Sequence, residues 1–309
     1  MATTPPILIH AGYQKTASTF LQNQIFSDQA VFAAPWGTQS AMAIEAFILS
    51  HPAHFESDAI RADFANTDGR IPVISHEDLL GYPIYGRYHA EAALTRMAKA
   101  FPEARLLVCV REQRSMMMAQ YLQYIRQGGS ETIQTMLTGN MDRPGFRPIL
   151  RRDHFEYDLS YDLACAHFPR EQVLFMPHEL MRADPAAYMQ RLNGFLGTTL
   201  EETRLEQVVY ARRGDAAILL ERWLNRWVPV PAVRPARYED NTRLVKLKNT
   251  LIKRIDPILS RHTKIGARQI TAIRGFIDDT IGIEYAASNQ RLSDRIELDL
   301  TGLGYPVAT

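Results

Sequence analysis

The chain has 309 residues, of which 46% are hydrophobic and 22% are charged, and its formal net charge is +1. These values are typical of an ordinary globular protein, and the global charge does not indicate nucleic-acid binding. A chain of this length can bury a core of good size, and we expect a single domain over residues 1–309.

The cysteines and the N-terminal residues bear on the compartment. Cys109 and Cys165 have no metal-binding spacing, which favours a reducing compartment without a disulfide framework. Residues 1–6 are too few and too polar for a signal peptide, and no apolar run approaches the length of a membrane span. We therefore expect a cytoplasmic protein.

The first predicted element is a short strand over 7–9, because this run is apolar and β-branched. Gly12 ends the run, and a hydroxyl-rich loop with one lysine, Lys15, leads into a helix predicted over 20–26. In such a unit the N–H groups and dipole of the helix start, the lysine charge and the hydroxyls can hold a phosphate-like anion. The alternative is a surface turn with a lysine and a hydroxyl-rich helix start.

The rest of the chain alternates between predicted strands and helices. Apolar runs predict further buried strands over 70–75, 105–110 and 172–176. Helical spacing, glycine stops and the Asp-Pro start at 184–185 predict helices over 40–49, 91–101, 114–127, 159–168, 184–196 and 216–227. Alternation of this kind predicts an α/β fold in three layers, with a central, mostly parallel sheet flanked by helices.

Residues 228–265 read as a linker followed by a helix on the edge of the domain. The proline-rich run 228–235 is the linker, and basic and apolar residues alternate at helical spacing over 246–261. The amphipathic helix could make a peripheral contact with a membrane or bind a partner. The alternative is a solvated helix packed on the domain edge.

Polar residues follow three of the predicted strands. They are Lys15 with its hydroxyls, then Ser75-His76-Glu77, and finally Arg111. Ligands of open α/β sheets bind beyond the carboxyl ends of the strands, so we expect these residues to converge on one edge.

The stretch Gly12-Tyr-Gln-Lys15-Thr-Ala-Ser-Thr19 resembles the 5′-phosphosulfate loop of sulfotransferases that use 3′-phosphoadenosine-5′-phosphosulfate (PAPS). The resemblance implies a P-loop-like fold and PAPS as the donor, with adenosine 3′,5′-bisphosphate (PAP) as the product and no metal. It also implies that the donor is bound by the loop residues Lys15, Thr16, Ala17, Ser18 and Thr19. Ala17 stands where most members of the family have glycine.

Two further segments resemble the family's 3′-phosphate site. Arg111 follows a strand as the family's arginine does, and a guanidinium suits a terminal phosphate because it offers two parallel donors. The family has a serine eight residues later, where this chain has Ala119; Ser115, one helical turn earlier, is the candidate substitute. The segment Arg212-Arg213-Gly214 resembles the loop that closes this site in the family. Adjacent arginines are also often only solvated.

Sulfuryl transfer requires a base for the acceptor, and the family supplies a histidine or a glutamate just past a central strand. The order Ser75-His76-Glu77-Asp78-Leu79 resembles bacterial and carbohydrate-type members and favours Glu77 as the base, with His76 as the alternative. His76 could equally be a structural histidine. Lys15 would stabilise charge on the leaving phosphate.

The resemblance covers nearly the whole chain, including 172–197 and the tail 288–306. It implies a small-molecule, glycan or glycolipid acceptor that offers a hydroxyl or an amine. Several aromatic residues could line an acceptor pocket or belong to the core: Trp36, Phe55, Phe146, Phe155 and Tyr157.

Two other functions stay open at this point. A P-loop kinase or NTPase could use Glu77 and Asp78 to hold Mg²⁺, although a Walker loop has a glycine beside its lysine and this loop has none. A catalytically decayed nucleotide-binding module would explain Ala17 and Ala119.

Overall fold

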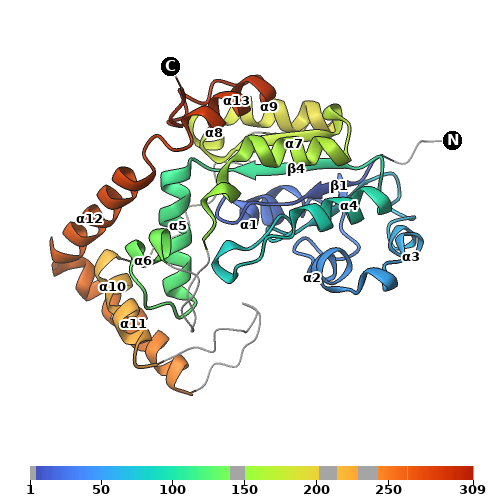
Figure 1. Ribbon diagram of the computed structural model, residues 1–309. Coiled ribbons are helices and arrows are strands. Elements are labelled where there is room, and N and C mark those ends of the chain that lie inside the picture. The colour runs from blue at the N-terminus through green and yellow to red at the C-terminus, as the bar shows by residue number, and fades with distance from the viewer. Residues whose placement is uncertain (1–4, 140–149, 202–213, 229–242, 263, 309) are drawn as a thin grey trace.

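The computed structural model describes residues 5–139, 150–201, 214–228, 243–262 and 264–308 (Figure 1). Its centre is a five-stranded sheet in the order β2-β3-β1-β4-β5, and all its strand pairs are parallel. The strands are β1 (Leu8–His10), β2 (Phe32–Ala33), β3 (Ile71–Ser75), β4 (Arg105–Val110) and β5 (Val173–Pro177). The predicted α/β architecture is confirmed.

Successive side chains of β1 face the two sides of the sheet. Leu8 belongs to a core cluster with Phe20, Tyr188 and Leu192, whereas Ile9 belongs to a second cluster that includes Met97. Strands buried on both faces read as continuous apolar runs, which is why the sequence predicted four of the five strands. The two-residue strand β2 has too little pattern to be predicted.

Helices cover both faces of the sheet and extend beyond one side (Figure 1). They are α1 (Ser18–Phe20), α2 (Ala41–Ile44), α3 (Ser57–Ala62), α4 (Ala90–Ala100), α5 (Gln113–Arg126), α6 (Ile133–Thr138), α7 (Tyr157–His167), α8 (His178–Ala183), α9 (Pro185–Leu196), α10 (Asp215–Asn225), α11 (Arg243–His262), α12 (Lys264–Ile281) and α13 (Ala286–Ile296). Helices α1 and α2 continue directly as π-helical segments, Leu21–Ile25 and Glu45–Leu49.

The predicted helices are all present, with ends displaced by one or a few residues. Asp184 accepts a hydrogen bond from the Ala187 N–H, and Gly197 ends α9 in the left-handed conformation, as the sequence pattern indicated. The short helices α3, α6 and α8 and the longer helices α12 and α13 were not predicted. Except for Val228, the predicted linker lies outside the described residues. The helix predicted over 246–261 lies within α11.

The C-terminal helix α13 fastens the tail of the chain to the body of the molecule. Gln113 and Asn289 exchange side-chain hydrogen bonds of 2.7 and 3.1 Å, and the Ser288 hydroxyl donates to Asp158. All four side chains are buried, so the polar residues of the tail motif have a packing role. Among the described helices, none is long and apolar enough to cross a membrane.

Candidate active site

The loop after β1 folds back over one of its own carbonyl groups. The Tyr13 carbonyl accepts hydrogen bonds from Thr16 Oγ1 at 2.5 Å and from Ser18 Oγ at 3.4 Å. Thr16 and Ser18 are buried, and Ser18 is the first residue of α1. The first N–H groups of a helix have no intrahelical acceptor, so this helix start presents donors. Thr19 is exposed on the same turn.

Two residues of this loop have left-handed backbone conformations. Lys15 has φ 65° and Ala17 has φ 66°, and Ala17 is the N-cap of α1. This conformation favours glycine and costs an L-residue roughly 1–2 kcal/mol. The glycine of related loops therefore has a conformational reason, and Ala17 adopts the same kind of backbone at a cost.

Gly12 lets this loop lie directly against the end of β3. A Cβ atom at Gly12 would lie 2.6 Å from the Glu77 carbonyl oxygen, and the residue has φ +126°. Both the missing side chain and the positive φ require glycine here. The close approach brings the lysine loop and the Ser75-His76-Glu77 segment together, as predicted.

Arg111, at the end of β4, completes the convergence of the three strand ends. Its Nη1 donates to the Lys15 carbonyl at 3.1 Å, and its Nε donates to Ser115 Oγ at 2.9 Å. The Ser115 hydroxyl in turn donates to the Glu112 carbonyl at 2.9 Å. Ser115 thus orients Arg111, and Arg111 holds the lysine loop.

The Lys15 ammonium lies in a partly buried position with further cations near it. Burial lowers its pKa first, and repulsion from Arg126 and Arg111 lowers it further, whereas Glu77 opposes the shift. Among the described residues neither Lys15 nor Arg111 forms an ion pair with a carboxylate. This edge of the sheet is therefore suited to an anion.

Glu77 is held by two glutamine side chains that the sequence gave no reason to select. Gln22 Nε2, on the π-helical segment after α1, lies 3.4 Å from Glu77 Oε2, and Gln39 Nε2 lies 3.4 Å from Oε1. Gln22 is buried and also donates to Ser75 Oγ at 3.1 Å, and Ser75 Oγ lies 2.8 Å from His10 Nδ1. This buried chain fixes the amide that faces Glu77.

His76 makes a local contact that limits its use as a base. Its Nδ1 accepts a hydrogen bond of 3.1 Å from the Asp78 N–H, and the residue is 7% exposed. One ring nitrogen is therefore committed to the turn after β3. The geometry agrees with the preference for Glu77, and both roles stay predictions.

The end of β5 adds residues to the arginine side of this edge. Burial lowers the pKa of His178 to about 4, and the neighbouring Arg111 and Arg182 lower it too. Glu179 Oε1 accepts from the Glu112 N–H at 3.1 Å. The sequence analysis did not select either of these two residues.

The other predicted site residues are less informative. Arg212 and Arg213 lie outside the described residues. Gly214 precedes α10, and its N–H donates to Asp256 Oδ1 at 3.0 Å. Ala119, on α5, is half-buried.

Four of the five aromatic residues left open by the sequence are described, and they belong to the core or pack against it. Phe155 and Tyr157 are fully buried, and Trp36 and Phe55 pack against the same core cluster. Phe146 lies outside the described residues.

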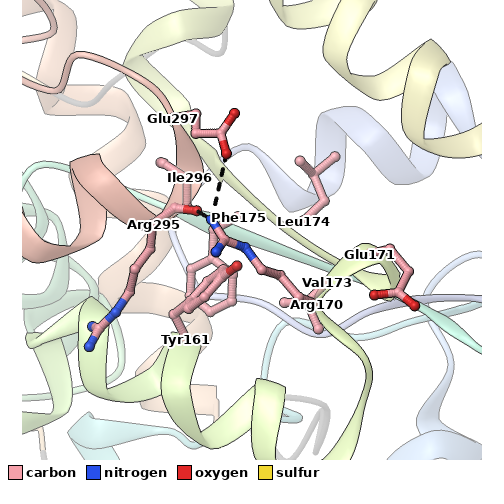
Figure 2. A pocket seen from close by; sticks show the side chains of 9 residues that line it. All are labelled: Tyr161, Arg170, Glu171, Val173, Leu174, Phe175, Arg295, Ile296 and Glu297. Carbon is pink, nitrogen blue, oxygen red and sulfur yellow. Dashed lines mark hydrogen bonds and ion pairs between the residues drawn. The ribbon is translucent and has the colours of Figure 1, made fainter.

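A hollow of about 360 Å³ lies elsewhere, at the amino-terminal half of β5 (Figure 2). Arg170 faces Glu297 there at 3.7 Å, and Arg295 pairs with Asp162 at 2.7 Å and with Asp158 at 3.4 Å. These arginines are neutralised by the chain's own carboxylates. The hollow therefore lacks the positive charge that the described residues leave unpaired at the carboxyl edge of the sheet, where Lys15 and Arg111 lie. Within the described ranges there is no group of three or more metal-ligating side chains.

The sequence comparison concerns the part of the chain that contains β4, β5 and Arg111. Residues 87–202 match a family model described as the sulfotransferase family. This part of the chain is similar to the sulfotransferase family. No curated protein matches the chain significantly.

The structural comparison extends the sulfotransferase likeness over nearly the whole chain. The crystal structure of a sulfotransferase from Alicyclobacillus acidocaldarius is 15% identical and has a TM-score of 0.52, covering 97% of this chain and 99% of that one. At this identity the match shows a common fold. The resemblance to sulfotransferases and the predicted fold are thereby confirmed.

Two other solved structures are similar at lower TM-scores. The sulfotransferase domain from the curacin biosynthetic pathway is 14% identical over 81% of this chain and 98% of that one, with a TM-score of 0.41. Mouse sulfotransferase SULT7A1 complexed with PAP is 13% identical over 91% of this chain and 84% of that one, with a TM-score of 0.37. We draw no argument from either.

Proposed function

We propose that the protein transfers a sulfuryl group from PAPS to a hydroxyl or amine of an acceptor. The observation that carries this proposal is the hydrogen bond of 3.1 Å from Arg111 to the Lys15 carbonyl. It joins the two cationic segments, from adjacent strands, that the resemblance assigns to the two phosphates of the donor. Neither cation is neutralised by a described carboxylate.

The residues of the site have distinct tasks in this proposal. Lys15 and the donors at the start of α1 stabilise negative charge on the 5′-phosphate as it leaves. Arg111, oriented by Ser115, binds the 3′-phosphate through paired donors. The Thr16 hydroxyl holds the loop closed through Tyr13.

Glu77 is the base of this mechanism. As the acceptor oxygen bonds to sulfur, its proton moves to the Glu77 carboxylate, and the bond from sulfur to the 5′-phosphate oxygen breaks to release PAP. Gln22 and Gln39 orient the carboxylate through one oxygen each. A base works only when it reaches the proton in the bound complex, so its fixed position matters.

The acceptor class is a small molecule, a glycan or a glycolipid. The test is transfer from sulfur-radiolabelled PAPS to a fractionated extract, with Glu77→Gln as the inactive control. We expect a labelled acceptor with wild type and none above background with the variant. PAP binding without transfer to any acceptor would indicate a decayed nucleotide-binding module instead.

A kinase or NTPase would be recognised by its nucleotide and metal dependence. Transfer from ATP that requires Mg²⁺, with no transfer from PAPS, would overturn the proposal.

A further inference from the structure

Helices α10 and α11 expose large apolar side chains at the end of the molecule away from the sheet. Trp223, on α10, is 54% exposed, and Trp227, two residues after the end of α10, is 71% exposed. Leu247 and Leu251 are 67% and 45% exposed on α11. The rings of the two tryptophans lie 6.4 Å apart, and the two leucines, four residues apart, lie on one face of α11. We call these four residues the Trp–Leu surface.

The two helices form an antiparallel hairpin that brings both pairs to the same level. The Gly214 N–H donates to Asp256 Oδ1 at 3.0 Å, and Lys248 Nζ donates to Asn225 Oδ1 at 2.6 Å. Asn225 lies between the two tryptophans in sequence, and Lys248 follows Leu247 directly. Figure 1 shows the two helices side by side, on the far side of α5 from the sheet.

The Trp–Leu surface is not the face by which these helices pack on the molecule. The buried residues of α10 are Ala217, Ile218, Glu221 and Asn225, and those of α11 include Val245, Lys248 and Ile252. Trp223 on α10 and both leucines on α11 lie away from the buried sets by their positions in the helical repeat. The apolar side chains are therefore additional to those needed for folding.

Among the described residues of this hairpin, the exposed charged side chains are basic. They are Arg226, directly after α10, and Lys246, Lys253 and Arg254 on α11. The acidic residue among the described side chains of α11 is Asp256, and it accepts from the Gly214 N–H. Exposed tryptophans beside a basic, amphipathic helix are typical of surfaces that lie at the lipid headgroups.

We propose that the Trp–Leu surface docks on an anionic lipid bilayer, with the tryptophans and leucines at the headgroup level and the lysines and arginines against acidic lipids. The excess of positive charge favours this occupant over a second copy of the chain, because two basic surfaces repel one another. The inference uses residues outside the candidate active site and does not depend on sulfuryl transfer.

The test is binding of the whole protein to vesicles of phosphatidylcholine with and without phosphatidylserine. We expect sedimentation with the anionic vesicles alone, loss of binding at high salt, and a blue shift of tryptophan emission. Trp36, whose Nε1 donates to Asp63 at 2.8 Å and whose ring packs on Phe64, should not respond. The shift should disappear in Trp223→Ser with Trp227→Ser.

Two charge-reversal pairs separate a local surface from a general effect of charge. Lys246→Glu with Lys253→Glu should weaken binding to anionic vesicles about thirtyfold or more, since the loss of each basic residue is expected to weaken it about fivefold. Arg268→Glu with Arg274→Glu changes the same charge at exposed positions of α12 and should leave most of the binding.

Three results would overturn the proposal. They are wild-type protein that ignores anionic vesicles, an equal loss of binding in both pairs, and a wild-type dimer that dissociates in the double tryptophan variant while vesicle binding is absent. The last result would show that the Trp–Leu surface is an interface between two copies of this chain. Wild-type binding and its salt dependence need no variant, so poor folding of a variant cannot hide the answer.

Discussion

At the amino-terminal half of β5, the arginines are neutralised by carboxylates, whereas at the carboxyl edge of the same sheet Arg111 meets neutral oxygens. Arg170 and Arg295 pair with Glu297, Asp158 and Asp162. Arg111 instead donates to a hydroxyl and a carbonyl. The first arrangement fastens the C-terminal segment to the body of the molecule, and the second leaves positive charge for a bound anion to balance. Substitutions at the two ends should therefore differ in kind.

The largest effect is expected for Glu77→Gln. Loss of a general base typically lowers turnover by about two to four orders of magnitude. Because glutamine keeps the size of the side chain, PAP affinity should be retained, as measured by calorimetry. His76→Ala should be milder, since His76 Nδ1 serves the turn through the Asp78 N–H. A larger loss in His76→Ala than in Glu77→Gln would assign the base to His76.

The next largest effect is expected for Lys15→Met. Turnover should fall by roughly two to three orders of magnitude because one electrostatic stabiliser is removed. The matched variant at the other end, Arg170→Met, should leave turnover unchanged and lower Tm by about a few degrees at most, because Arg170 is largely exposed. Equal losses of turnover in the two variants would remove the distinction between the two ends.

The pH dependence of the free energy of unfolding gives a second test of the environment of Lys15. Its pKa is lowered in the folded protein, chiefly by burial, so the unfolded chain binds more protons between the lowered pKa and the ordinary value of 10.5. Wild type should therefore gain stability relative to Lys15→Met as pH rises through that interval. Denaturant melts of both proteins across this range measure the difference. A relative loss of stability would contradict the burial of the ammonium.

Gln22→Leu tests how Glu77 is positioned, and its effect should be smaller. One hydrogen bond to a charged group is lost, so turnover should fall about tenfold with an unchanged KM for the donor. Gln39→Leu removes a contact of the same length at an exposed position, and water should largely replace it. Equal losses of turnover in both variants would argue against the buried chain from His10.

Ala17→Gly should have the smallest effect. The left-handed backbone at this N-cap favours glycine, so the free energy of unfolding should rise by about 1 kcal/mol at most. Chemical denaturation of the ligand-free protein measures this change. A clear loss of stability would show that the loop has another conformation in solution.

The sequence predicted four of the five strands and most of the long helices because their apolar residues recur at the period of the element, as in 105–110 and 184–196. It did not predict β2, α12 or α13. It also predicted that Lys15, Glu77 and Arg111 would meet, since parallel strands end at one edge. It could not select Gln22, because a glutamine on a helix has no distinctive spacing. The contact with Glu77 arises from the packing of the π-helical segment against β3.

The aromatic residues and Ser115 also show what the sequence alone could not predict. Trp36 and Tyr157 could be pocket or core residues by composition alone, and only packing shows that they belong to the core. The spacing of Ser115 suggested a phosphate contact. The structure shows its hydroxyl between Arg111 Nε and the Glu112 carbonyl, a position that depends on how α5 leaves the sheet.

The most direct test of the account is calorimetric binding of PAP and of ADP to wild type and to Arg111→Met. If Arg111 binds the 3′-phosphate, wild type should bind PAP at least about tenfold more tightly than ADP, as expected for charge-assisted hydrogen bonds. In Arg111→Met this preference should fall to nearly one, chiefly through weaker binding of PAP. Equal affinities for the two nucleotides in wild type, or an unchanged preference in the variant, would contradict the assignment of the carboxyl edge to PAPS.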